Sequence, residues 1–211
     1  ENGKQKTKSF TVKKPVTDEL WENHLKGKEP GLGIVPINEN NKCKWGCIDI
    51  DEYNFDHKKI IKILKQKNLP LIVFRSKSGG AHLFLFTKEP VEASLMRLKL
   101  KLIAAHLGYS ECEIFPKQEY ILAERGDTGN FLNLPYHGGD KSTRYAFLEN
   151  GDASNLSDFV LLHKKNSLTK KQLENLHLET KHQVKNGSVT DGPPCLQTLC
   201  SEGFPEGSRN D

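Results

Sequence analysis

The sequence predicts an α+β domain with a mostly antiparallel central sheet that is backed by helices. Two observations carry this prediction. Short apolar segments with strand-like alternation are interspersed with segments in which hydrophobic residues recur at helical spacing. In the middle of the chain, two apolar segments are separated only by a short glycine-containing turn, which is typical of a hairpin.

The first part of the chain contains one predicted helix and two predicted strands. Residues 17–26 form the helix, which Thr17 caps and whose Trp21 faces inward. Residues 31–37 form a short strand that ends before an asparagine-rich turn. Residues 45–51 form the second strand, because they are an apolar run of strand length that carries two aspartates.

A helix and the hairpin follow. Residues 56–67 carry isoleucines and a leucine at helical spacing, and the Asn-Leu-Pro sequence after them ends this helix. The two hairpin strands are residues 71–75 and 82–86, which are short apolar runs rich in leucine and phenylalanine.

The remaining elements alternate between the two types. Residues 91–107 form a strongly amphipathic helix, and residues 111–115 then alternate between polar and apolar side chains as a strand does. The last predicted elements are two strands, residues 131–136 and 144–148, and two helices, residues 155–163 and 169–179.

Composition favours a soluble globular chain. The 211 residues are 36% hydrophobic and 27% charged, which suits one well-cored domain with appendages. No run of about 18 apolar residues occurs, so we expect no membrane-spanning segment. The net charge of +4 permits a polyanionic partner without requiring one.

The five cysteines favour a reducing, cytoplasmic compartment, since their number is odd and most of them lie in predicted strands. Cys43 and Cys47 have the spacing of half a zinc site, as do Cys195 and Cys200. No further ligand stands at a convincing spacing, so buried free thiols are favoured over zinc.

The most informative segment is residues 45–51, Trp-Gly-Cys-Ile-Asp-Ile-Asp. On a strand, Asp49 and Asp51 share one face while Ile48 and Ile50 pack beneath it. Two adjacent carboxylates repel each other, and a hard divalent cation with oxygen ligands is the counter-ion that fits them best. The alternative is a pair of solvated aspartates at the end of a strand.

A second candidate site is the turn of the hairpin, which contains the chemical groups that bind phosphate oxygens. Its glycines allow positive φ and a close approach of backbone to a ligand. The spacing is not that of a P-loop. The alternative is an ordinary glycine hairpin with solvated charges. The candidate nucleotide-binding residues are Arg75, Ser76, Lys77, Ser78, Gly79, Gly80 and His82.

A third candidate site is the strand at 111–115, where Glu111 and Glu113 again share a face. A two-metal phosphoryl-transfer site needs about three carboxylates, so Asp49 and Asp51 need one of these glutamates. Glu113 lies deeper in the strand and is preferred, while Glu111 stays an alternative ligand or a solvated residue. Lys117 and Gln118 follow the strand and are candidate contacts to nucleotide or template.

A fourth set of candidates lies between residues 125 and 144. Asn133 and Tyr136 could touch a ribose or a base, although a buried structural asparagine is an equal alternative. Arg125, His137 and Arg144 could contact a nucleic-acid backbone, although each signal is weak alone and such residues are more often ordinary surface charge.

The order of these motifs resembles that of the archaeo-eukaryotic primase superfamily, and is similar to the primase-polymerase domains of phages, mobile elements and TOTE-type conflict systems. Asp49 and Asp51 match its first motif, Ser78 to His82 match its second in an expanded form, and Glu113 best matches its third. The sequences Glu-Ile-Phe-Pro-Lys-Gln and Asn-Phe-Leu-Asn-Leu-Pro-Tyr add to this resemblance.

This resemblance implies an RRM-like sheet packed with a smaller N-terminal α/β unit, and template-directed joining of NTPs or dNTPs with two Mg²⁺ or Mn²⁺ ions. It implies Asp49, Asp51, Glu113 and His82 as catalytic residues, with the three carboxylates as metal ligands. The implied partners are a single-stranded DNA template, a primer strand and further domains of a longer protein, such as a helicase. A single-stranded nucleic-acid binding module and another metal-dependent enzyme acting on nucleotides are the alternatives.

The expected organisation follows from the same resemblance and from local composition. Residues 1–16 are a polar, lysine-rich segment that we expect to be flexible, and residues 17–180 are the expected catalytic domain. Residues 181–194 are polar and punctuated by Gly and Pro, as in a linker. Residues 195–211 resemble the truncated start of an accessory helical region.

Overall fold

The computed structural model describes residues 10–12, 14–176 and 178. The described part is an α+β structure with antiparallel sheets, as predicted. Its helices are α1 (Asp18–Leu25), α2 (His57–Gln66), α3 (Ala93–Leu107), α4 (Leu156–Asn166) and α5 (Lys170–Glu174), with short 3₁₀ turns η1 (Ala123–Arg125) and η2 (Gly139–Lys141). Its strands are β1 (Gly33–Ile34), β2 (Lys42–Ile50), β3 (Ile72–Arg75), β4 (Ala81–Glu92), β5 (Glu113–Phe115) and β6 (Leu132–Asn133).

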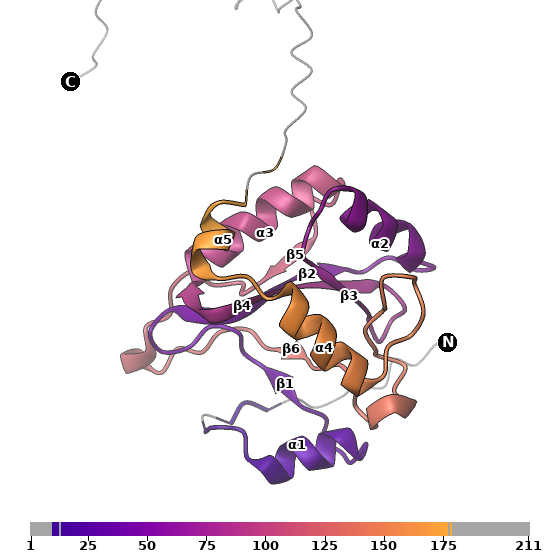
Figure 1. The fold of residues 1–211 in the computed structure, drawn as a ribbon. Coiled ribbons are helices and arrows are strands. Elements are labelled where there is room, and N and C mark those ends of the chain that lie inside the picture. The colour runs from indigo at the N-terminus through magenta and orange to yellow at the C-terminus, as the bar shows by residue number, and fades with distance from the viewer. Residues whose placement is uncertain (1–9, 13, 177, 179–211) are drawn as a thin grey trace, which may run out of the picture. The chain divides into compact units, whose positions relative to one another are not determined.

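The strands form two sheets (Figure 1). The larger sheet has four strands in the order β3-β4-β2-β5, and every neighbouring pair is antiparallel. Its elements follow one another in the chain as β2-α2-β3-β4-α3-β5. The smaller sheet is the antiparallel pair β1–β6. The long strands β2 and β4 therefore form the centre of the larger sheet, and residues far apart in sequence meet across it.

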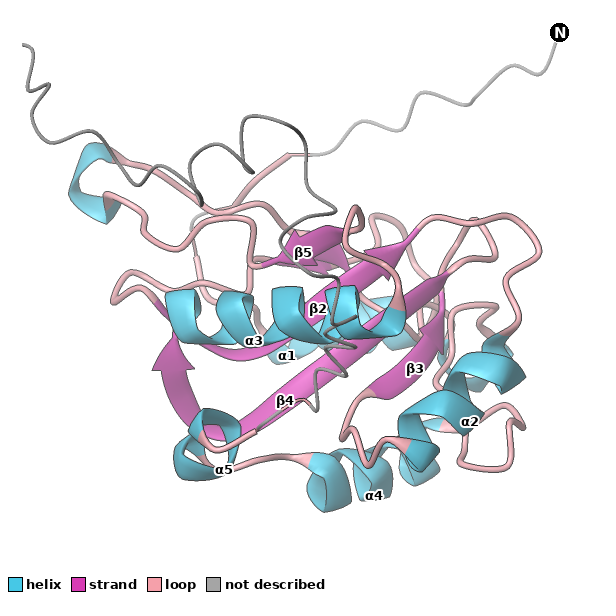
Figure 2. Ribbon diagram, turned by 90° about the horizontal axis from the view of Figure 1, so that it is seen from above, coloured by secondary structure: helices cyan, strands magenta, loops and turns pink. Residues whose placement is uncertain are grey.

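Both faces of the larger sheet are covered (Figure 2). On one face, side chains of β2 and β4 such as Ile48 and Leu83 pack with α2, α3 and α5. On the other face, Cys47, Phe74 and Phe84 pack with side chains of α4 and β6. Burial of apolar area on both faces is the main force that holds these layers together.

Several strand and helix boundaries differ from the predicted ones, most clearly at β4, at β2 and at residues 144–148. β4 extends to Glu92, because Val91 pairs with Cys43 and is buried, so α3 begins at Ala93. β2 likewise begins at Lys42 and ends one residue before Asp51. Residues 144–148 form only isolated bridges to β3 and to Ala153, and are not a full strand.

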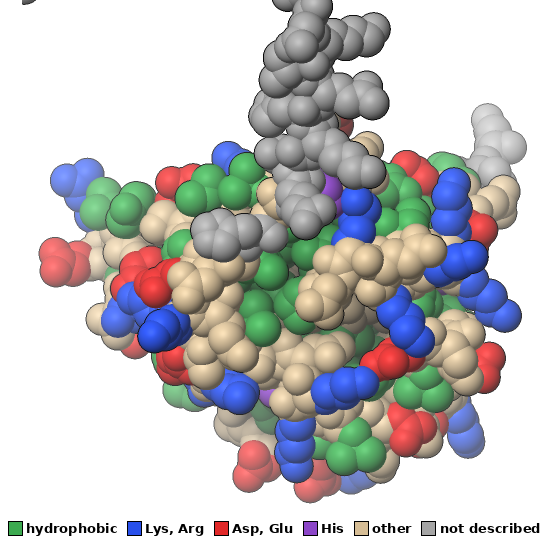
Figure 3. Space-filling view, turned by 45° about the horizontal axis from the view of Figure 1, so that its top comes forward, with side chains coloured by type: hydrophobic (Ala, Val, Ile, Leu, Met, Phe, Trp, Pro, Cys, Tyr) green, Lys and Arg blue, Asp and Glu red, His purple; other side chains and the backbone are tan. Residues whose placement is uncertain are grey.

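The described residues contain no helix long and apolar enough to span a membrane. In the face shown in Figure 3, side chains of Lys and Arg alternate with those of Asp and Glu around hydrophobic side chains. The mild positive net charge thus forms no continuous basic field on that face. The predicted linker and the predicted accessory region lie outside the described residues.

Candidate active site

The strand register places the three sequence motifs in one row across the larger sheet. Asp49 on β2 lies directly opposite His82 on β4 and, on its other side, opposite Glu113 on β5. Residues directly opposite each other in an antiparallel pair point to the same face of the sheet. Asp51 follows the end of β2 two residues after Asp49, so the first motif lies between the other two.

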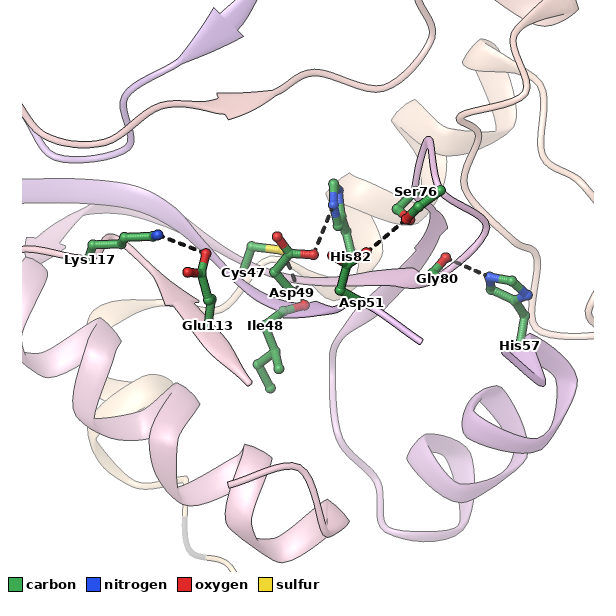
Figure 4. A network of polar contacts seen from close by, with 11 residues as sticks. Cys47, Ile48, Asp49, Asp51, His57, Ser76, Gly80, His82, Glu113 and Lys117 are labelled. Atoms are coloured by element: carbon green, nitrogen blue, oxygen red, sulfur yellow. Dashed lines mark hydrogen bonds and ion pairs between the residues drawn. The ribbon is translucent and has the colours of Figure 1, made fainter. Parts of the chain in front are cut away.

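Each of the three carboxylates contacts a different group (Figure 4). Nε2 of His82 lies 3.2 Å from Oδ1 of Asp49. The hydroxyl of Ser78 donates a hydrogen bond of 2.9 Å to Oδ1 of Asp51. Nζ of Lys117 lies 2.7 Å from Oε2 of Glu113. The hairpin residues His82 and Ser78 therefore contact the two aspartates directly. Lys117, four residues after Glu113, contacts that glutamate.

Glycine at position 80 allows the hairpin to approach β2. A Cβ atom at Gly80 would lie 2.2 Å from the carbonyl oxygen of Ile50, closer than any side chain tolerates. Gly79 has a φ of +96°, in the left-handed region that glycine adopts without strain. The Gly-Gly pair thus lets the turn lie against the end of the aspartate strand.

The other candidates of the hairpin lie around this turn. The Oγ atoms of Ser76 and Ser78 are 3.0 Å apart, so Ser76 extends the hydrogen-bonded chain that ends at Asp51. The guanidinium of Arg75 donates to the carbonyl of Thr143, and Lys77 is exposed. The hairpin therefore places the hydroxyl of Ser78 and the imidazole of His82 beside the aspartates, and donors of this kind can bind phosphate oxygens.

The aspartates rest on a buried layer, as expected. Ile48 and Ile50 are fully buried beneath them. Cys47 is also fully buried, and burial together with the nearby Asp49 carboxylate raises the pKa of its thiol well above the usual value. Cys43 packs in the core cluster of the opposite face, so these two thiols do not share a site.

The structure distinguishes the two glutamates of the third motif. Glu113 is part of β5 and faces Asp49, whereas Glu111 precedes the strand and accepts a hydrogen bond from the hydroxyl of Ser110. Lys117 also lies over the ring of Phe115, 5.2 Å from its centre. Gln118 exchanges hydrogen bonds with Asn130.

The chemistry of Asp49, Asp51 and Glu113 fits a hard divalent cation, because all three supply carboxylate oxygens from one end of one sheet face. Within the described residues, however, no group of three or more acidic, histidine or cysteine side chains is gathered closely enough to hold a metal ion. Lys117 contacts Glu113, and Ser78 contacts Asp51. A shared ion therefore requires these side chains to rearrange.

The fourth set of candidates lies apart from these contacts. Asn133 is exposed on β6, which excludes the alternative of a buried structural asparagine. Tyr136 is buried, and its hydroxyl donates to the carbonyl of Ser154 and accepts from the amide of Ala146. The hydroxyl of Tyr136 thus bonds within the core, and the contact of Tyr136 with a ribose or a base stays a prediction.

The remaining basic candidates lie on loops and turns. Arg125 is exposed at the end of η1. His137 lies 3.9 Å from the carboxylate of Glu29 and packs edge-on against the ring of His24. Burial lowers the pKa of Arg144, and the charge of Glu29 opposes this shift. His137 and Arg144 thus belong to the surroundings of Glu29.

Sequence reasoning missed one residue that contacts the hairpin. Nε2 of His57, in the first turn of α2, lies 3.0 Å from the carbonyl oxygen of Gly80 (Figure 4). The only signal in the sequence was its position shortly after the two aspartates. No spacing pattern connects a helix-start histidine with a hairpin more than twenty residues away.

Comparison with known proteins agrees with this geometry. The family model of the archaeo-eukaryotic primase domain of TOTE conflict systems matches residues 1–176. No curated protein matches the chain. The matched segment is more than half of the chain, and it contains Asp49, Asp51 and Glu113, the hairpin and both sheets. The chain therefore belongs to the archaeo-eukaryotic primase domain family of TOTE conflict systems.

Proposed function

We propose that the domain is a template-directed primase-polymerase, which joins NTPs or dNTPs along a single-stranded DNA template. Membership of the family indicates a nucleotidyltransferase of the primase-polymerase type. The observation that carries the finer proposal is the row His82–Asp49–Glu113 across adjacent strands, with Asp51 bonded to the hairpin. The row combines oxygen ligands for cations with donors for phosphates, and nucleotidyl transfer needs both.

In this proposal, Asp49, Asp51 and Glu113 hold the divalent cations. When bound, two Mg²⁺ or Mn²⁺ ions supply Lewis-acid activation of the primer 3′-hydroxyl and neutralise charge on the triphosphate. The fully buried Ile48 and Ile50 fix the backbone that carries the aspartates. The carboxylates can therefore exchange their present side-chain partners for a cation without a large backbone movement. Only the side chains that contact them must move.

The hairpin binds the triphosphate. The imidazole of His82 lies 3.2 Å from the carboxylate of Asp49, and the hydroxyl of Ser78 donates to that of Asp51, so a phosphate oxygen close to those carboxylates is within their reach. A neutral imidazole can donate one hydrogen bond to such an oxygen. Exposed Lys77 adds positive charge at the tip of the turn, and Arg75 adds it at the base.

Lys117 and Gln118 contact the nucleotide or the template beside Glu113. Exposed Asn133 and Arg125 make further contacts to the nucleic acid. We also propose that the four-stranded sheet is the RRM-like core, and that α1 with the β1–β6 pair forms the smaller N-terminal unit. The proposed partners are a primer–template and further domains of a longer protein, such as a helicase.

The test is a gel assay with a single-stranded template, Mg²⁺ or Mn²⁺, and labelled dNTPs or NTPs, with and without a primer. We expect metal-dependent products that the double variant Asp49→Ala/Asp51→Ala does not make. Asp18→Asn/Glu19→Gln, which neutralises two exposed acids on α1, is the matched control and should retain activity. Absence of incorporation under every condition, with single strands still bound, would favour a binding module instead.

A further inference from the structure

His57 connects the hairpin to α2, a helix that carries none of the three proposed metal ligands. It is the first residue of α2 and follows Asp56, whose side chain caps that helix. Its Nε2 lies 3.0 Å from the carbonyl oxygen of Gly80. Because a carbonyl oxygen only accepts, Nε2 must carry the hydrogen and donate it, and both the Nε2–H neutral form and the protonated form can do so.

Two aromatic rings fix the position of this imidazole. The ring of His57 stacks on Phe147, with centroids 4.7 Å apart and planes 28° from parallel. It meets the ring of Phe55 edge-on, with centroids 5.2 Å apart. A donor held by such packing loses little side-chain freedom when it forms its hydrogen bond, which is the property of a positioning group.

Gly80, which His57 contacts, is held in place by several other contacts. The carbonyl of Gly80 also accepts the amide of Ser76, which closes the turn. On its other side, the backbone of Gly80 lies against Ile50 with no room for a Cβ. Gly80 is thus held by the turn, by the end of β2 and by His57.

We propose that His57 is a positioning residue for nucleotidyl transfer, which fixes the Ser76–Gly80 turn so that Ser78 and His82 face the two aspartates. This inference rests on the proposed function, because the turn is the proposed triphosphate site. Gly80 precedes β4, where His82 is the second residue, so a displacement of its backbone moves both Ser78 and His82. A misplacement of about 1 Å in such a site can cost about 100-fold in rate.

The experiment compares His57→Phe with His57→Gln. Phenylalanine keeps a ring for Phe147 and removes the donor, whereas glutamine keeps a donor and removes the ring. Hydrogen–deuterium exchange of the amides of residues 76–81 is measured together with kcat/KM for nucleotide incorporation. We expect His57→Phe to raise hairpin exchange and to lower kcat/KM, each by about tenfold, with a melting temperature close to that of the unsubstituted protein. His57→Gln should retain most of both properties.

Hairpin exchange as slow in His57→Phe as in the unsubstituted protein would overturn the proposal. An equal defect in His57→Gln would do the same, because it would show that ring packing is what matters. The exchange measurement does not depend on activity. If the unsubstituted protein incorporates no nucleotide, the proposed function fails, and hairpin exchange still decides whether His57 holds the turn.

Discussion

The two sheets of this domain use their polar side chains differently. On the four-stranded sheet, Asp49, His82 and Glu113 lie opposite one another, and the hydroxyl of Ser78 reaches Asp51. Around the β1–β6 pair, polar side chains mainly bond to nearby backbone, as the hydroxyl of Tyr136 does. The comparison indicates that strand pairing brings polar groups from distant parts of the chain together on the four-stranded sheet, whereas polar side chains around the β1–β6 pair mainly satisfy backbone groups.

The strongest test of this contrast is the double variant Asp49→Asn/Asp51→Asn. We expect nucleotide incorporation to fall by at least about 1,000-fold, because the cation ligands are lost. The free energy of unfolding should stay the same or rise, since removing adjacent like charges relieves repulsion. Single-turnover incorporation and urea unfolding measure the two quantities. A loss of stability parallel to the loss of activity would show that the aspartates are structural.

The four-stranded sheet was largely predictable because its strands are apolar and alternate over several residues. Alternation placed Asp49 and Asp51 on one face above Ile48 and Ile50, and the structure agrees. The pairing of Glu113 with Asp49 was not predictable from the sequence, since strand order and register depend on packing across the whole sheet.

The surroundings of the smaller sheet were predicted less well, for a physical reason. β1 and β6 have two residues each, so no alternation marks them. A polar residue in a loop serves equally well as a ligand contact or as a partner for backbone groups, and composition does not distinguish the two. Tyr136 shows this, since it was predicted to contact the ligand and its hydroxyl bonds to the carbonyl of Ser154 and the amide of Ala146.

The second test concerns backbone approach, and compares Gly80→Ala with Gly31→Ala. At Gly80 the new Cβ meets the carbonyl of Ile50 at 2.2 Å, so the hairpin must shift. We expect a loss of about 1–3 kcal/mol in the free energy of unfolding and a 10- to 100-fold loss of activity.

At Gly31, beside the smaller sheet, the nearest atom to a new Cβ belongs to the side chain of His137, at 3.0 Å. This side chain can move, so we expect a cost below about 1 kcal/mol and activity close to that of the unsubstituted protein. Chemical unfolding and incorporation assays on both variants check the pair. Equal effects would contradict the view that the hairpin requires glycine at position 80 for its approach to β2.

The third test removes the ammonium group of Lys117, which contacts Glu113. In Lys117→Met the carboxylate loses its partner at 2.7 Å, while the pair is exposed enough that stability should change by less than about 1 kcal/mol. We expect Mn²⁺ to bind about fivefold more tightly in the absence of nucleotide, since roughly 1 kcal/mol of competing ion pairing is lost. Electron paramagnetic resonance of free Mn²⁺ measures this affinity.

The same variant should show a higher KM for nucleotide, because Lys117 is a proposed contact to it. Glu22 and Lys26 on α1 form a comparable exposed ion pair at 2.7 Å, so Lys26→Met is the matched control. An unchanged Mn²⁺ affinity in Lys117→Met would indicate that Glu113 takes no part in cation binding, and that Asp49 and Asp51 bind the cation alone.

The smallest expected effect lies beside the β1–β6 pair, where a buried histidine joins three segments. His24 is 1% exposed, its Nε2 lies 2.8 Å from the carbonyl of Pro135, and its Nδ1 accepts from the amide of Leu32. The neutral Nε2–H form satisfies both contacts, and protonation of Nδ1 would break the second. Burial lowers the pKa of His24, the bond to Pro135 opposes this shift, and the charges of His137 and Arg144 reinforce it.

Because the unfolded chain binds this proton near pH 6.5 and the folded chain resists it, stability is lost as the pH falls below about 6.5. We expect a loss of about 1 kcal/mol between pH 7.5 and 5.5 that is smaller in His24→Gln. Burial also lowers the pKa of His163, so the quantity to measure by urea unfolding is the difference in pH dependence between the unsubstituted protein and His24→Gln. Equal pH dependence in both proteins would show that His24 is not the cause of the loss of stability. Faster hydrogen exchange at pH 5.5 in residues 18–34, with the four-stranded sheet still protected, would show that the smaller sheet opens first because a single imidazole joins its segments.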